Sequence, residues 1–104
     1  MTRKSTASAS HEAGLIADLR EDPALAEAFL RVALQEAGDE EGDYLLQRSL
    51  RLLVEAHGMG KVAKAAGIPR ESLSRALSPR GNPRLSTLQA VTRALGMQLT
   101  VARV

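Results

Sequence analysis

Residues 58–82 read GMGKVAKAAGIPRESLSRALSPRGN, and this stretch contains two short helical patterns separated by a glycine. The apolar spacing predicts a first helix from about Lys61 to Ala66 and a second from about residue 70 to Leu77. Gly67 can adopt the left-handed backbone conformation that a tight turn between helices requires. The small side chain of Ala63 allows the two helices to approach closely. The stretch therefore predicts a helix-turn-helix.

The polar face of the second helix has the chemistry that reads the major groove of DNA. Arginine can bind a guanine edge through two hydrogen bonds, and serine can donate to or accept from base edges. The residues predicted to contact bases are Arg70, Ser72, Ser74 and Arg75. Phosphate contacts, which set register rather than sequence, are predicted for Lys61, Lys64, Arg80, Asn82 and Arg84. An ordinary solvated helix with two surface arginines would have the same composition, so that alternative stays open.

The charges are divided unevenly along the 104 residues. Residues 1–46 contain four basic and ten acidic side chains, whereas residues 47–104 contain ten basic and two acidic ones. The second part therefore has a net charge of +8, which suits a polyanion because bound phosphates release their counterions. The first part has a net charge of −6, which suits a basic protein. Solvated faces with no partner would give the same counts.

The composition favours a single all-α domain. Phe29 and Tyr44 are the whole aromatic set, so the core is expected to consist of Leu, Val and Ala in packed helices. With no cysteine, and with His11 and His57 far apart in sequence, no metal site is predicted. No motif for catalysis or for a cofactor is present. No apolar run reaches membrane length, so a cytoplasmic protein that is not an enzyme is expected.

About five helices are expected within a single domain at residues 13–104, of which residues 43–104 form the DNA-binding part. Residues 1–12 lack periodicity, and we expect a disordered tail there.

In the acidic part, Asp22 is predicted to cap a helix whose apolar stripe includes Leu25, Phe29 and Val32/Ala33. Asp43 is predicted to cap the next helix, which runs to about His57.

The C-terminal part ends in two further predicted elements. A last helix is expected over about Leu85–Leu95, and Gly96 ends it. Alternation of apolar and polar side chains over Met97–Val101 then predicts a short β-strand at an exposed edge. Such an edge could pair with a second copy of the chain. A homodimer is expected because helix-turn-helix proteins usually read two half-sites about 34 Å apart.

About four-fifths of the chain, from Glu21 onward, resembles the addiction-module antidote (antitoxin) proteins, which have a lambda-repressor-like (XRE- or HigA-type) helix-turn-helix. The stretches that carry the resemblance are EDPALAEAFLRVALQEAGD at 21–39, GMGKVAKAAGIPRESLSRALSPRGNPRLSTL at 58–88, and ALGMQLTV at 94–101. The resemblance implies a toxin partner, usually a small basic RelE- or HigB-like ribonuclease. It also implies repression of the module's own operon through binding to operator DNA.

This chain departs from the family pattern at two positions of the predicted recognition helix. A serine stands in the family where this chain has Pro69, and a tyrosine often stands where it has Ser74. The cap of the helix and its base preference are therefore expected to differ from those of its relatives. The acidic segment around Glu21–Asp43 is the candidate for toxin contact. Two alternatives are a stand-alone, phage-like repressor without a toxin and a protein-interaction module that has lost DNA binding.

Overall fold

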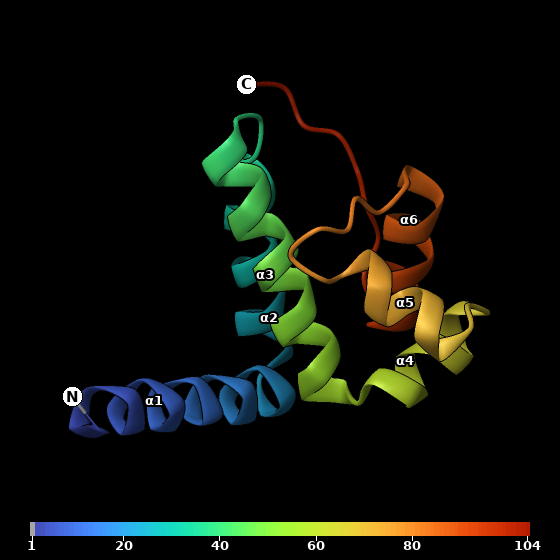
Figure 1. Ribbon diagram of the computed structural model, residues 1–104. Helices are drawn as coiled ribbons and strands as arrows, with labels where there is room; N and C mark the ends of the chain where they lie inside the picture. The colour runs from blue at the N-terminus through green and yellow to red at the C-terminus, as the bar shows by residue number, and fades with distance from the viewer. Residues whose placement is uncertain (1) are drawn as a thin grey trace.

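The computed structural model describes the backbone of residues 2–104 and the side chains from His11 onward. This part of the chain has six α-helices, in agreement with the all-α class expected from the sequence (Figure 1). They are α1 (Thr2–Glu21), α2 (Pro23–Glu36), α3 (Glu40–His57), α4 (Met59–Ala66), α5 (Arg70–Ala76) and α6 (Leu85–Ala94). Helices α1 and α2 pack against α3 and against each other, while α4 contacts α5 and α6.

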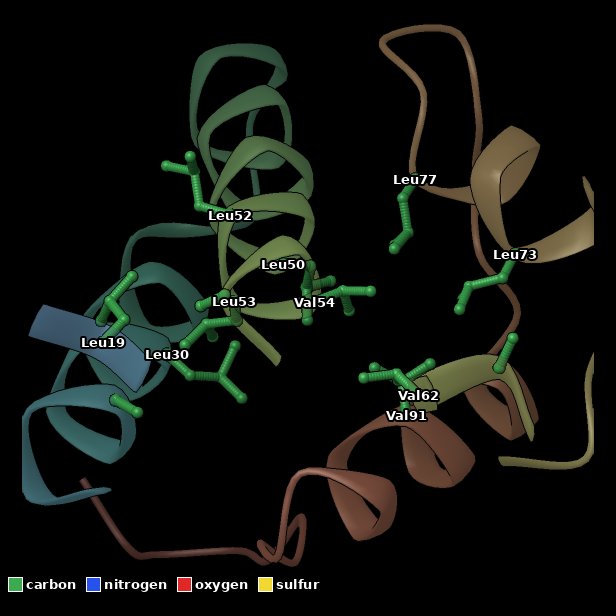
Figure 2. Close-up of a cluster of buried hydrophobic side chains, with 13 residues drawn as sticks. Leu19, Leu30, Leu50, Leu52, Leu53, Val54, Val62, Leu73, Leu77 and Val91 are labelled. Carbon is green, nitrogen blue, oxygen red and sulfur yellow. The ribbon is translucent and has the colours of Figure 1, made fainter. Parts of the chain in front are cut away.

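Helix α3 lies between the two groups of helices and gives both of them a buried face. Figure 2 shows Leu19, Leu30 and Leu53 together on the side of α1 and α2. On the other side, Val62, Leu73, Leu77 and Val91 form the core of α4–α6. Val54 of α3 is fully buried and lies between these two sets. The two groups therefore share one hydrophobic core through α3.

Helix α2 begins as the sequence predicts, and its buried face overlaps the predicted stripe only in part, at Ala33 and the half-buried Phe29. The Asp22 carboxylate accepts a hydrogen bond from the backbone N–H of Leu25 at 3.1 Å, which confirms its role as the cap. The buried residues, however, are Ala26, Leu30 and Ala33. Leu25 and Val32 of the predicted stripe are exposed. Two alanines on the inner face allow α1 and α3 to approach α2 closely, which explains why that face is buried.

Helix α3 begins earlier than predicted. Asp39 has extended backbone angles, and its carboxylate accepts from the N–H of Gly42 at 2.7 Å, so Asp39 is the cap. The prediction that Asp43 caps this helix is wrong. The Asp43 carboxylate instead accepts from the N–H of Gly38 at 2.9 Å and fixes the turn that precedes the helix. The helix is longer by one turn because Asp39 provides an acceptor at the first possible position.

Helix α1 occupies much of the segment for which the sequence predicts a disordered tail. Its backbone is helical from Thr2, and the structure therefore has one helix more than the five expected. No proline lies within Thr2–Glu21, and its last two turns are fixed by the buried Leu19 and by Arg20, whose Nε donates to the Ala56 carbonyl at 2.7 Å. A helix anchored at its end can continue outward through alanines and lysine.

The predicted C-terminal strand is not formed in the single chain. Within residues 2–104 the structure has no β-strand, and Met97–Val104 is an extended segment that leads away from α6 (Figure 1). Val101 is 94% exposed. A β-strand needs a neighbour to share its hydrogen bonds, and this segment has none within the described chain.

Among the described residues, no helix combines the length and the apolar character needed to cross a membrane.

Candidate nucleic-acid interface

The turn between α4 and α5 has the geometry that its sequence predicts. Gly67 adopts the left-handed conformation, with φ 70° and ψ 29°. Its N–H donates to the Lys64 carbonyl at 3.2 Å, and the N–H of Ile68 donates to the Ala63 carbonyl at 2.9 Å. This pair of bonds is the Schellman motif, which ends a helix and redirects the chain at once. The turn therefore fixes the direction in which α5 leaves α4.

Helix α5 buries one side and presents the other to solvent. Leu73 and Leu77 are almost completely buried in the core with Val62 and Ala63 of α4. Arg70 and Arg75 are exposed, whereas Ser72 and Ser74 are half-buried on the flanks of the helix. Both predicted arginines thus have free access to a partner, and the two serines have restricted access.

Glu71 is a member of the exposed face that was not among the predicted base contacts. It is exposed and precedes Arg75 by four residues, so both lie on the same outward side of α5. A carboxylate there can accept a hydrogen bond from the N4 amino group of cytosine. The exposed position of Glu71 on α5 therefore adds it to the candidate residues of this face.

The predicted phosphate-binding residues lie on both sides of α5. Lys61 and Lys64 are exposed on α4, and Arg80, Asn82 and Arg84 are exposed in the loop between α5 and α6. In the part of the chain that the structure describes, none of these cations and neither arginine of α5 forms a salt bridge; the ion pairs are Arg31–Glu27, Arg48–Glu12 and Arg51–Glu55. Their charges are therefore not neutralised by acidic neighbours.

Gln47 of α3 holds the loop that follows α5, a role that the sequence did not reveal. Its side-chain amide donates toward the backbone carbonyls of Ala76 at 3.1 Å and Gly81 at 2.6 Å, and also toward that of Ser78. The loop therefore lies beside α3 (Figure 1). A half-buried glutamine between Leu46 and Leu50 on an otherwise apolar stripe was the available signal.

The same loop requires a glycine, and two further hydrogen bonds fix the end of α5. A Cβ atom on Gly81 would lie 2.3 Å from the Ala76 carbonyl oxygen, so only glycine fits there. The Ser78 hydroxyl donates to the Arg75 carbonyl at 2.7 Å, and Arg51 of α3 donates to the Ser74 carbonyl at 3.3 Å. Helix α3 therefore positions both the end of α5 and the segment that carries Arg80 and Asn82.

Two features at the start of α5 are the lack of a side-chain cap and the position of the Arg70 side chain. Pro69 provides no side-chain hydrogen bond to the helix, as expected from its departure from the family pattern. The Arg70 side chain passes close to Gly60 of α4, since a Cβ there would lie 3.9 Å from its Nη1 atom. Part of the exposed Arg70 side chain therefore lies beside Gly60 at the α4–α5 junction.

The described part of the chain is an all-α protein of six helices with a basic surface on its C-terminal half. This surface consists of the cations around α5, whose direction is fixed by the left-handed turn at Gly67. The family described as "Probable addiction module antidote protein" matches residues 12–103, so the chain belongs to this antidote family. An uncharacterized protein of Haemophilus influenzae is 36% identical over 75 residues, which cover 72% of this chain and 77% of that protein. No solved structure matches the chain significantly.

Membership in the family has one direct consequence for partners. An antidote acts on a toxin, so a toxin partner is implied. This protein offers its partners two chemically different faces, the acidic surface of α1–α3 and the basic surface of α4–α6.

Proposed function

We propose that this protein is the antitoxin of a type II toxin–antitoxin module, and that it neutralises a small RelE- or HigB-like ribonuclease and represses its own operon. The observation that carries the DNA-binding part is the left-handed turn at Gly67, which sets α5 on α4 with Arg70 and Arg75 exposed. Helix α5 would be the recognition helix of a lambda-repressor-like helix-turn-helix, and residues 43–104 would be the DNA-binding part.

The contacts divide into two groups in this proposal. Arg70, Ser72, Ser74 and Arg75 face the major groove and read base edges. Lys61, Lys64, Arg80, Asn82 and Arg84 bind phosphates on both sides of the groove. Because Gln47 holds the loop at Ala76 and Gly81, the phosphate-binding loop is fixed relative to the recognition helix before DNA binds.

A homodimer completes the DNA-binding unit. The extended segment Met97–Val101 has alternating apolar side chains and no strand partner in the single chain. Pairing of this segment with its copy in a second chain would satisfy the backbone groups of both edges. A two-fold dimer would then present two recognition helices to a palindromic operator.

The test is fluorescence anisotropy of the purified protein on DNA from upstream of its own gene, with a salt series and excess random competitor. We expect competitor-resistant binding that weakens as salt increases. Arg75→Ala and Arg70→Ala should each weaken specific binding by about 1–3 kcal/mol. Arg31→Ala is the charge-matched control, because Arg31 is an exposed arginine of α2, which does not contact α4–α6.

Two results would contradict parts of the proposal. Unchanged operator affinity in both α5 variants would show that α5 is not the recognition helix. The toxin part is tested by co-expression with the product of the neighbouring gene. The proposal expects this product to be a small basic protein that stops growth when expressed alone and permits growth together with this protein. Tight operator binding without any effect on that protein would identify a stand-alone repressor.

A further inference from the structure

A cleft of about 420 Å³ lies between the first turns of α3 and the loop that joins α5 to α6. Glu40, Asp43 and Tyr44 of α3 form one side of it. Pro79, Gly81 and Asn82 of the loop form the other side. Leu46, Leu50 and Leu88 add apolar surface to the lining. The cleft is therefore where the acidic half of the protein meets the loop that carries the predicted phosphate contacts.

The charges at the cleft select the chemistry of its occupant. Glu40 and Asp43 are exposed, and neither forms a salt bridge within the described residues. Carboxylates at this position repel DNA phosphates and attract cations. An arginine or lysine side chain suits the site best, because its aliphatic stem can lie on the leucines while its charged group pairs with the carboxylates.

Tyr44 adds a contact that a cationic side chain can use. Its side chain is aromatic, 49% exposed, and lines the cleft together with the two carboxylates and the leucines. A cation above an aromatic ring is attracted by the ring's electron density. Exposed tyrosines surrounded by other apolar groups are also frequent centres of protein interfaces.

We propose that this cleft is the docking site for a cationic side chain, arginine or lysine, carried on an apolar segment of the toxin. The inference rests on the proposed antitoxin function and names the surface that would perform it. The net charge of −6 on residues 1–46 complements a basic protein. The site narrows the predicted toxin contact from the whole segment Glu21–Asp43 to the first turns of α3 and the facing loop.

The position of the cleft links toxin binding to DNA binding. Gln47 lines the cleft and also holds the loop carbonyls, and Asn82 belongs both to the cleft and to the predicted phosphate contacts. A toxin side chain in the cleft touches the loop that binds DNA. If toxin in the cleft changes the affinity of the loop for DNA, DNA changes the affinity for the toxin by the same factor.

The first experiment uses the single tyrosine of the chain as a reporter. Replacement of Tyr44 by 3-fluorotyrosine gives one fluorine resonance, because the sequence contains no other tyrosine. The probe is the unlabelled product of the neighbouring gene, which is the toxin in the proposed function. We expect its addition to shift the resonance in step with complex formation, measured in parallel by light scattering. A complex that leaves the chemical shift unchanged would overturn the docking site while leaving the antitoxin function intact.

Two further outcomes of this experiment also decide the inference. Failure to form any complex would contradict the proposed antitoxin function and, with it, the proposed docking site. A resonance that moves on dilution of this protein alone, together with a change in its mass, would show that a second copy covers the cleft and would overturn the proposal.

The second experiment compares two double variants that remove the same charge. Glu40→Gln with Asp43→Asn removes both carboxylates of the cleft and leaves an acceptor oxygen at each position. Glu21→Gln with Glu36→Gln is the control, because these exposed residues lie at the ends of α1 and α2, outside the cleft lining. Calorimetry should show that the cleft variant binds the toxin about tenfold more weakly or worse, while the control stays within about threefold. Equal losses in both would show general charge attraction and overturn the specific site.

Discussion

The acidic and basic halves of this protein begin their helices in different ways. Helices α2 and α3 are capped by the carboxylates of Asp22 and Asp39. Helices α4, α5 and α6 follow Gly58, Pro69 and Arg84, none of which forms a side-chain cap hydrogen bond. An aspartate cap stabilises a helix, but it also places a negative charge at the helix N-terminus. The basic half lacks this stabilisation, which is what the proposed binding of a polyanion to its surface would favour.

The two halves also differ in how their surface charges are used. The salt bridges among the described residues all join residues of α1, α2 and α3. The exposed cations of α4, α5 and the following loop have no acidic partner there. Exposed ion pairs contribute little to stability, so their absence costs the fold little and leaves these cations available to the proposed partner.

The largest expected effect comes from truncating one buried leucine in each half. This pair of variants tests whether the acidic and basic halves unfold together. Leu19 of α1 and Leu73 of α5 are both 0% exposed. Leu19→Ala and Leu73→Ala should each destabilise the protein by about 2–5 kcal/mol, because each leaves a cavity in the core. Since α3 supplies buried residues to both sides, each variant should show one cooperative transition in thermal unfolding followed by circular dichroism. Two separate transitions would show that the halves fold independently.

Glycine-to-alanine substitutions give the next largest effect and again probe one site in each half. A Cβ on Gly42 would lie 2.0 Å from the Glu36 carbonyl oxygen, and one on Gly81 would lie 2.3 Å from that of Ala76. Each substitution should cost about 3 kcal/mol, because backbone must move to make room. Gly14→Ala in α1 is the control: it meets nothing within 4 Å and should stabilise by about 0.5–1 kcal/mol. Urea unfolding measures all three, and equal effects would contradict the close contacts.

Gln47→Ala separates stability from function in the basic half. It removes the hydrogen bonds that hold the loop at Ala76 and Gly81. Unfolding should become easier by about 1–2 kcal/mol, since the freed carbonyls are partly rehydrated. Operator affinity should fall as well, because Arg80 and Asn82 lose their fixed positions. Gln98→Ala, at an exposed glutamine beyond α6, is the control for both measurements. A variant with lower stability but full DNA affinity would show that the loop does not contact DNA.

Sequence patterns predicted the features that local chemistry determines. The Asp22 cap, the left-handed Gly67 and the helical segments on either side of it were all anticipated, because each depends on a few neighbouring residues. The exposed arginines of α5 were also anticipated, since subtraction of the apolar positions leaves them on the outside. The candidate recognition surface was therefore accessible from the sequence.

The features that were missed depend on contacts between distant segments. Nothing local distinguishes the exposed Leu25 and Val32 from the buried Ala26 and Leu30, because the choice of face depends on how α1 and α3 approach α2. The role of Gln47 depends on a loop about 30 residues away in sequence. The predicted strand at Met97–Val101 needs a partner strand, which the single chain does not contain.

Substitutions of Pro69 have the smallest expected effect, and they test most directly why the helices of the basic half lack side-chain caps. Pro69→Ser restores a neutral acceptor at the start of α5 and should stabilise the protein by about 0.5–1 kcal/mol with little loss of operator affinity. Pro69→Asp provides the same cap and should stabilise at least as much. Its charge lies beside the predicted groove-binding face, however, so operator affinity should fall, and more steeply at low salt where screening is weak. If both variants bound the operator equally well, charge exclusion would not explain the missing caps, and the difference between the two halves would belong to folding alone.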